Sequence, residues 1–328
     1  MFVNWAHFLI PKVFIVLSLI VNPLFVNLIH TEKVFKFGDY RYLLYFFAGF
    51  NVTSALSDLL VPICVHTYRY ATVVFITEGL FENRSHFGGF LIACRCAFIS
   101  GTYGILNAHF IFRFLVLRYN QFVVQYFKNS GFGAACGLVV FHWFSWAIMT
   151  DITMGADGEV RDYIRESFEE TYGSMENVNT KVVIFSEASP DVVFRSWVGT
   201  IYVTFLATYS IILYLVLGYK IMSSLNRGLT TMSHKTTQMQ KQLFLALFVQ
   251  TAIPICVSFV PCTISLYGSA FRLDFLSWIN WSASVAVSSF PFLDPMAITL
   301  CLPALRNKLL LRIGFRLSPN KIQTISCL

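Results

Sequence analysis

The stretch Lys235–Pro261, KTTQMQKQLFLALFVQTAIPICVSFVP, decides the class of fold. Its apolar part continues beyond the quoted stretch, and residues 242–271 contain no Asp, Glu, Lys, Arg or His. This run exceeds the ~20 apolar residues that a helix needs to cross a bilayer core. Pro254 and Pro261 break the helical hydrogen bonding, and lysines stand at only one end. The stretch therefore predicts a kinked membrane-spanning helix with its basic end in the cytoplasm.

The composition supports a membrane protein throughout. The chain is 56% hydrophobic and 12% charged, with 34 Phe, whereas charged residues make up about a quarter of a soluble domain. The eight Cys form no Cys-x-x-Cys pair, and no His-x-x-x-His spacing occurs. Zinc and di-iron membrane enzymes therefore lose their main support, and we expect no metal, no cofactor and no enzymatic activity.

Apolar runs along the chain predict an all-α, seven-transmembrane helix bundle that forms one domain over residues 1–328. The second run is the least regular because Asp58 lies inside it. The expected spans are approximately 8–29, 42–65, 88–115, 129–150, 196–219, 242–267 and 275–300, with a long loop at 151–195 and a tail at 301–328.

Charge near the span ends predicts the orientation. One set of connections is rich in Lys and Arg, whereas loop 151–195 has ten acids against four bases. The positive-inside rule places the basic set in the cytoplasm, the N-terminus outside and the C-terminus inside. Asn83-Arg84-Ser85 is a glycosylation sequon in the first outer loop, which agrees with this orientation.

Two motifs resemble a known family. KQLFLALFVQTAIP and FPFLDPMAITL are similar to segments of the nematode serpentine chemoreceptors of the Str/Srj group. The resemblance implies a chemosensory G-protein-coupled receptor that binds a small volatile or lipophilic odorant. It also implies a heterotrimeric G protein as partner, and the plasma membrane, specifically the ciliary membrane of chemosensory neurons, as location.

The resemblance also suggests where a G protein binds. HFIFRF at residues 109–114 closes span three, and Arg113 stands where rhodopsin-like receptors carry the arginine of Asp-Arg-Tyr. We expect Arg113, Lys235 and Lys241 to contact the G protein. The alternatives are an interfacial arginine that snorkels to phosphates and lysines that only satisfy the positive-inside rule.

Candidate ligand contacts are polar-tipped or large aromatic residues in the middle and outer half of the bundle. An apolar pocket with few hydrogen-bonding groups would suit a small volatile or lipophilic molecule. The alternative is that each residue only packs in the core. The candidates are Phe98, Tyr103, Asn107, Tyr202, Tyr209 and Trp281.

Polar and proline residues near the inner ends of spans one and seven are candidate moving parts. Their matching depths predict a hydrogen bond between Asn22 and Asp294, and the alternative is that Asn22 bonds its own backbone beside Pro23. Asp58 and Asp294 are too far apart in depth to share a cation. The full set of switch and hinge candidates is Asn22, Pro23, Pro254, Pro261, Pro291, Asp294 and Pro295.

The outer side carries two further expectations. Val160, Ile164, Phe168 and Tyr172 recur every four residues, which predicts a short amphipathic helix that lies over the mouth as a lid. The alternative is a solvated loop. Arg95 is expected at the outer interface, as an anchor or as a partner for the acidic loop.

Three other functions remain open. A ligand-gated cation channel of inverted seven-span topology would need the N-terminus inside. A transporter or membrane-embedded enzyme would need paired intramembrane carboxylates, clustered His or an inverted repeat. A non-signalling receptor paralogue would have the same fold.

Overall fold

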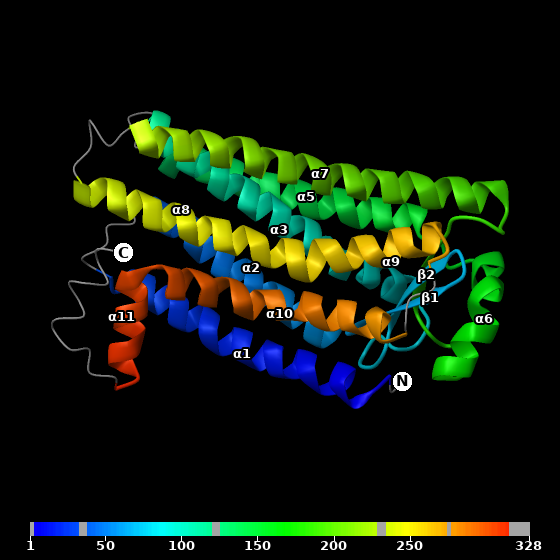
Figure 1. Ribbon diagram of the computed structural model, residues 1–328. Helices are drawn as coiled ribbons and strands as arrows, with labels where there is room; N and C mark the ends of the chain where they lie inside the picture. Colours follow the sequence, from blue (N-terminus) through cyan, green and yellow to red (C-terminus); the bar gives the residue numbers. More distant parts are fainter. Residues whose placement is uncertain (1–2, 33–37, 120–124, 228–233, 274–276, 315–328) are drawn as a thin grey trace.

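The computed structural model describes residues 3–32, 38–119, 125–227, 234–273 and 277–314. Within these ranges, seven helical segments are long and apolar enough to cross a membrane, as the apolar runs predicted. Figure 1 shows them as one elongated bundle, with the N-terminus at one end and helix α11 across the other. The end that carries the strands is called the sheet end, and the opposite one the α11 end.

The seven spans are built from α1 to α3, α5, α7 to α9 and α10, and the segment η3 lies within the sixth. Their bounds are α1 Trp5–His30, α2 Tyr40–Leu60, α3 His86–Arg118, α5 Phe132–Thr153, α7 Pro190–Arg227, α8 His234–Pro254, η3 Ile255–Phe259, α9 Val260–Ala270 and α10 Ser277–Cys301. A π-helical turn, η1 Phe127–Gly131, precedes α5, and α11 spans Pro303–Arg312.

Helix α3 is the centre of the bundle. Buried residues make up 72% of its most apolar window, a larger share than in any other described span. It packs against α2, α5, α7 and α8, and Figure 1 shows it running between these helices. Residues 97–110, in the middle of α3, are all buried, so side chains placed there face the interior.

The second span is shorter than the expected 42–65. Helix α2 ends at Leu60, and the chain continues as strand β1, Ile63–Tyr68. Pro62 has no N–H to continue the helical ladder, and the residues that follow are rich in β-branched and aromatic side chains. Hydropathy alone made this strand look like the end of a transmembrane helix.

The sheet has three antiparallel strands in the order β1-β2-β3. Strand β2, Ala71–Ile76, pairs with β1 through a tight hairpin, and β3, Thr180–Ile184, comes from the long acidic loop. The loop between α5 and α7 is thus tied to the α2–α3 connection by main-chain hydrogen bonds.

Helix α6, Gly158–Tyr172, covers this sheet, as Figure 1 shows at the sheet end. The amphipathic helix that the four-residue repeat predicted is confirmed: Val160, Ile164 and Phe168 are fully buried against the strands. Asp157 caps its first turn by accepting a hydrogen bond from the Val160 N–H. We call the three strands and α6 together the cap.

Within the cap, Arg161 of α6 joins this helix to the segment that leads into β3. Its guanidinium donates to the carbonyls of Met175, Glu176 and Val178 and to the hydroxyl of Thr180. The side chain is 5% exposed. Charge-assisted hydrogen bonds to several carbonyls compensate the cost of burying this arginine, so the loop folds without a disulfide.

The cap is also bonded to the last two spans. Thr72 in β2 donates to the Ser265 carbonyl in α9 at 2.9 Å. Thr67 in β1 donates to the side-chain oxygen of Asn280 in α10 at 3.0 Å. A movement of α9 or α10 at this end therefore displaces the cap as well.

Prolines mark irregular points in the sixth and seventh spans. The π-helical segment η3 lies between Pro254 and Pro261, and α10 contains Pro291 and Pro295. A proline lacks the N–H that would bond the carbonyl four residues earlier, so each of these helices is locally weakened.

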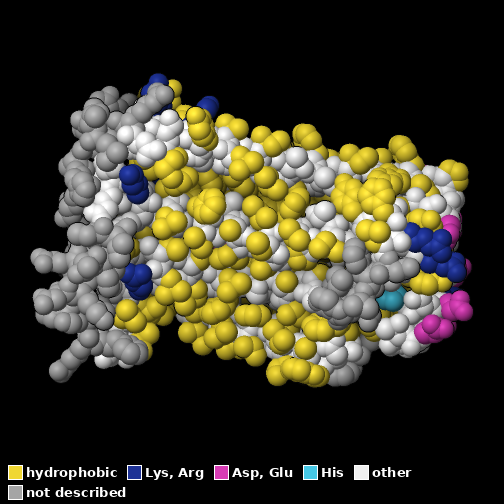
Figure 2. Space-filling model, viewed as in Figure 1, with side chains coloured by type: hydrophobic (Ala, Val, Ile, Leu, Met, Phe, Trp, Pro, Cys, Tyr) yellow, Lys and Arg dark blue, Asp and Glu magenta, His cyan; other side chains and the backbone are white. Residues whose placement is uncertain are grey.

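The surface agrees with a membrane location. Figure 2 shows a broad hydrophobic band between the two ends of the bundle. In that view the acidic side chains lie at the sheet end, whereas Lys and Arg lie at both ends. Large apolar side chains such as Phe141, Ile201 and Leu215 are more than half exposed, as expected where lipid replaces water.

Candidate ligand cavity and inner-end contacts

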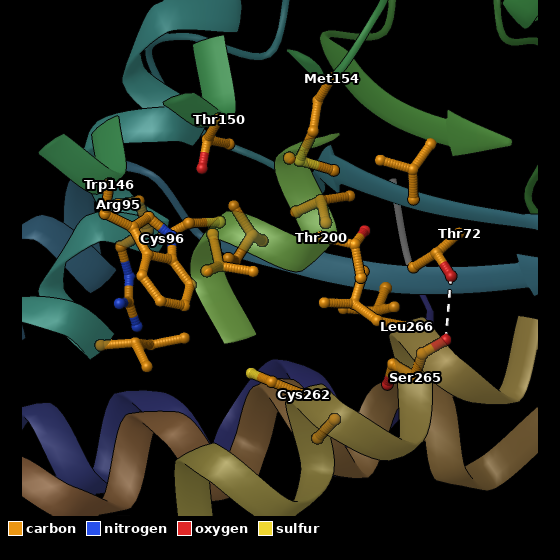
Figure 3. Close-up of a pocket in the computed structure, with 18 of the residues that line it drawn as sticks. Thr72, Arg95, Cys96, Trp146, Thr150, Met154, Thr200, Cys262, Ser265 and Leu266 are labelled. Atoms are coloured by element: carbon orange, nitrogen blue, oxygen red, sulfur yellow. Dashed lines mark hydrogen bonds between the residues drawn. The ribbon is translucent and has the colours of Figure 1, made fainter. Parts of the chain in front are cut away.

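A cavity of about 120 Å³ lies beneath the cap, between the strands and the helices. All three strands contribute to its wall, together with α3, α5, α7, α9 and α10. Figure 3 shows the side chains that point into it from these elements. The lining residues are Ile63, Val65, Thr72, Val74, Arg95, Cys96, Ile99, Trp146, Thr150, Thr153, Met154, Val183, Gly199, Thr200, Val203, Cys262, Ser265, Leu266, Ala283, Ser284 and Val287.

The lining is mostly apolar, and several of its hydroxyl groups already donate within the protein. Thr72 bonds the Ser265 carbonyl and the Ser269 hydroxyl, and Thr153 bonds the Met149 carbonyl. Such a wall gives a ligand little besides dispersion and apolar burial, apart from a few polar groups at fixed positions.

Arg95 supplies the charge in this wall. It lies on α3, is 2% exposed, and forms an ion pair with Asp58 of α2 through Nη2 and Oδ1 at 2.8 Å. Its Nε donates to the same oxygen at 3.2 Å. The expectation that Arg95 anchors at the interface or pairs with the acidic loop is therefore wrong, because the intramembrane Asp58 is its partner.

The pairing of Asp58 with Arg95 could have been predicted from the sequence. Helical rise places Asp58 and Arg95 at similar heights, about 25 Å from the α11 end of their helices. Spans two and three are consecutive and antiparallel, so equal heights bring the two side chains opposite each other. Taking Arg95 as an interfacial residue hid the pairing.

None of the six residues predicted to contact ligand lines this cavity. Phe98 packs against Phe50 and Trp143, and the carbonyl of Tyr103 accepts from the Tyr214 hydroxyl. Tyr202 packs in the cluster formed by α3, α5, α7 and α10, and Trp281 packs against the core of the cap.

The remaining two, Asn107 and Tyr209, belong to a buried polar network between α3, α5 and α7. The Tyr209 hydroxyl lies 2.5 Å from Nε2 of His142 and accepts from the Asn107 amide at 2.9 Å. Ser100 lies 3.2 Å from the other ring nitrogen of His142, and Ser210 accepts from Asn107. The sequence reasoning found two members of this network and missed His142.

At the α11 end, Arg113 joins three helices. Its Nη1 donates to the Gln240 side chain of α8 at 3.3 Å, and its guanidinium lies 3.8 Å from the centre of the Tyr40 ring of α2. The Tyr40 hydroxyl in turn lies 2.8 Å from Nδ1 of His109. Arg113 is 4% exposed, so it is buried in this arrangement and does not extend to the surface.

The two lysines expected beside Arg113 are on α8. Lys241 is exposed at the α11 end. Lys235 lies in the first turn of α8, but its side chain is outside the part of the chain that the structure describes.

The predicted hydrogen bond between Asn22 and Asp294 is not present. The Asn22 amide donates instead to the Pro291 carbonyl of α10 at 2.9 Å and to the Ser18 carbonyl of its own helix at 2.9 Å. Pro295 has no N–H to occupy the Pro291 carbonyl, which leaves that oxygen for Asn22. Among the described residues, Asp294 is fully buried and both its carboxyl oxygens lack a hydrogen-bond partner.

Asn83 is exposed in the connection between β2 and α3, at the sheet end. Asn51-Val52-Thr53 and Asn280-Trp281-Ser282 also match the sequon. They are out of reach of a modifying enzyme, because Asn51 and Asn280 are buried within α2 and α10. In the described ranges, no three His, Cys, Asp or Glu side chains gather as a metal site.

Comparison with known proteins identifies the family. Residues 1–309 match the family described as serpentine type 7TM GPCR chemoreceptor Srj. Serpentine receptor class J-38 of Caenorhabditis elegans is 36% identical over 308 residues, which covers 93% of each chain.

More distant relatives agree. G-protein coupled receptor str-33 of Caenorhabditis elegans is 23% identical over 293 residues, covering 85% of this chain and 81% of its own. Serpentine receptor class r-10 of Caenorhabditis briggsae is 22% identical over 285 residues, covering 82% and 80%. With the seven apolar helices and the match over most of the chain, this multi-pass membrane protein belongs to the nematode serpentine chemoreceptor family Srj.

Proposed function

We propose that this receptor binds a small apolar molecule in the cavity beneath the cap and activates a heterotrimeric G protein at its α11 end. The carrying observation is the largely apolar cavity of about 120 Å³ between the cap and the spans. Family membership supports a chemosensory receptor, and the cavity supports the ligand's size and polarity.

The size of the cavity favours a volatile ligand. In another protein an engineered dry cavity of about 150 Å³ holds one benzene molecule. By that measure the cavity beneath the cap, at about 120 Å³, accommodates about five non-hydrogen atoms. Molecules this small and apolar evaporate readily and also partition into lipid, which suits an odorant.

Charge supports the sheet end as the outer end. The acidic loop folds into the cap, and Asn83 is exposed on the same side. Besides the buried Arg113, described basic residues near the other end include Arg41, Arg118, Lys128, Lys220, Lys241, Arg306, Lys308 and Arg312. Positive residues stay in the cytoplasm, so the α11 end would face the G protein and the bilayer's anionic leaflet. We also propose the plasma membrane of the cilia of chemosensory neurons as the location, which is supported only by membership of a chemoreceptor family.

The path between the two ends runs through the sixth and seventh spans. Helices α9 and α10 line the cavity with Cys262, Ser265 and Ala283, and they lead into the weakened segments at η3 and Pro291–Pro295. Ligand binding shifts these spans only insofar as the ligand prefers the active arrangement. Lys241, which is exposed, and Lys235 are proposed contacts for the G protein.

At the inner end, the shift would release the contact between Arg113 and Gln240. This contact ties α3 to α8 and keeps Arg113 buried. When α8 moves away, the guanidinium becomes available to the carboxyl-terminal segment of a G protein. A single hydrogen bond from a charged donor stabilises the closed form by about 1.5–3 kcal/mol, which a ligand's differential affinity is able to offset.

The experiment is calcium or cAMP imaging in cells that carry the receptor and a G protein, screened with small volatile odorants. The control is the same screen with the G protein disabled. A response that disappears with the G protein supports the proposal. An odorant-evoked current that persists without it would instead indicate an ion channel.

A further inference from the structure

We infer that Arg95 is the polar anchor of the cavity and that it selects a neutral ligand with one hydrogen-bond acceptor, such as a ketone, aldehyde or ester, on a small apolar body. This inference rests on the proposed function, because it names the chemistry of the molecule that occupies the same cavity.

The Arg95 guanidinium uses only part of its hydrogen-bonding capacity within the described part of the protein. Nε and Nη2 of Arg95 both bond Oδ1 of Asp58, which leaves Nη1. Among the described residues Nη1 has no hydrogen-bond partner, although it is buried. A buried N–H group without a partner is costly, so an acceptor that reaches Nη1 gains more than it would from an exposed donor.

The guanidinium of Arg95 lies at one side of the cavity. Arg95 lines the cavity, and Figure 3 shows its guanidinium beside the Trp146 ring on one side of the space, with Thr72 and Ser265 on the other. Thr72 is already engaged with the Ser265 carbonyl. The Ser265 hydroxyl lines the same side and, among the described residues, has no hydrogen-bond partner. Arg95 therefore supplies the charged donor at one end of a mostly apolar chamber, and the open group opposite it is a neutral hydroxyl.

The charge balance of the Arg95–Asp58 pair favours a neutral ligand. Asp58 already neutralises Arg95, so the wall carries a balanced pair that is almost fully buried. A carboxylate ligand would add an uncompensated negative charge to this apolar space, and an ammonium ligand would place its charge near the guanidinium. A pure hydrocarbon would leave Nη1 unsatisfied. A neutral acceptor avoids all three costs.

The test measures binding without any G protein. The full-length receptor is reconstituted in lipid nanodiscs, and equilibrium dialysis against empty nanodiscs separates binding from partition into lipid. The radiolabelled probes are cyclobutanone, methylcyclobutane and cyclopropanecarboxylate, which are similar in size and match the volume of the cavity. We expect cyclobutanone to bind at least about tenfold more tightly than methylcyclobutane, in line with one hydrogen bond to a charged donor.

The informative variant replaces both partners, Arg95→Met with Asp58→Asn, because removing one alone would leave a buried charge unpaired. It should abolish the ketone's advantage and leave methylcyclobutane binding within about twofold of the wild-type value. The matched control removes another ion pair at the sheet end, Lys181→Met with Asp151→Asn, whose partners lie 2.7 Å apart and do not line the cavity. This control should keep the full ketone preference.

The possible results distinguish a failure of the role given to Arg95 from a failure of the proposed receptor function. Equal binding of ketone and hydrocarbon, tighter binding of the carboxylate, or a preference that survives in the double variant would each overturn the role of Arg95. If none of the probes binds, the inference fails for ligands of this class. The G-protein screen with other odorants is then the readout on which the proposed receptor function stands or falls.

Discussion

The side-chain amide of Asn22 donates a hydrogen bond of 2.9 Å to the main-chain carbonyl of Pro291 and so joins α1 to α10. The Ser18 hydroxyl donates to the same carbonyl at 3.3 Å. In a regular helix this carbonyl would accept from the N–H of residue 295, but Pro295 has none. The first span thus completes the hydrogen bonding that the seventh lacks.

This relationship gives a prediction about stability. Asn22→Ala should lower the free energy of unfolding by about 1–3 kcal/mol, because the Pro291 carbonyl then stays buried without its principal donor. Pro295→Ala supplies an N–H four residues after Pro291, so in that background the Asn22→Ala loss should be much smaller. The measurement is thermostability in detergent for the four members of the double-mutant cycle.

The comparison with Asp294 is the control for that cycle. The Asn22 amide does not bond Asp294, so Asn22→Ala and Asp294→Asn should have additive effects on thermostability. Strong coupling between Asn22 and Asp294, or additivity between Asn22 and Pro295, would contradict the arrangement described.

The cap should loosen on acidification. Burial between the strands and α6 lowers the pKa of the His66 imidazole to about 4, from 6.5. Between those two values the unfolded cap binds a proton that the folded cap does not, so its stability falls as the pH falls. The slope is at most ~1.4 kcal/mol per pH unit. Hydrogen exchange of α6 amides at pH 7 and pH 5, corrected for intrinsic rates, measures this loss.

The neutral variant His66→Gln separates this effect from the acidic residues of the loop. Its cap should lose less stability between the two pH values than the wild-type cap, since nothing at position 66 titrates. An identical pH dependence in both proteins would show that His66 is not responsible. The contact of His66 with Ser167, at 3.1 Å, is the position where α6 should first open.

The inner-end contact predicts a pair of opposite phenotypes. Gln240→Leu removes the acceptor that holds Arg113, so ligand-independent G-protein signalling should rise. Arg113→Ala should instead reduce signalling to near background, because the proposed G-protein contact is lost. Both are measured as cAMP or calcium at equal surface expression. Normal signalling by Arg113→Ala would remove its coupling role, and unchanged basal signalling in Gln240→Leu would remove the closed contact.

The glycosylation site tests the orientation. If the sheet end is outside, Asn83 carries a glycan, and Asn83→Gln should abolish the gel shift that an endoglycosidase produces. Asn51→Gln is a poor control because Asn51 is buried in α2, so Ser85→Ala, which destroys the same sequon, is the matched one. A shift that persists in both variants would place the glycan elsewhere.

Hydropathy was enough to predict the bundle because lipid imposes long apolar helices, and each span meets that condition by itself. The four-residue repeat of α6 was readable for the same reason: one short segment carries the whole pattern. The sheet was not predicted. Ile63–Tyr68 looked like a helix end, and Thr180–Ile184 acquires its strand conformation from a partner more than a hundred residues away.

The candidate site was harder to predict than the fold. The direction in which a side chain points depends on the rotation of its helix about the helix axis as well as on the height of the residue along that axis. Helical rise placed Asn22 and Asp294 at one depth, but it does not say which atom each side chain reaches. The missing N–H of Pro295 was visible in the sequence, but the prediction did not use it to recognise the Pro291 carbonyl as an acceptor that lacks its helical donor. The cavity itself depends on the cap, so residues chosen on the spans alone fell beside it.

The most direct test of the account asks whether the cavity is where the ligand acts. An odorant that evokes a G-protein response is titrated on wild type, on Ala283→Leu, which fills part of the cavity, and on Tyr202→Phe, which lies outside its lining. We expect at least about a tenfold loss of potency in Ala283→Leu and little change in Tyr202→Phe, at equal surface expression. Full potency in Ala283→Leu together with a large loss in Tyr202→Phe would contradict it and return the ligand to the residues of the spans.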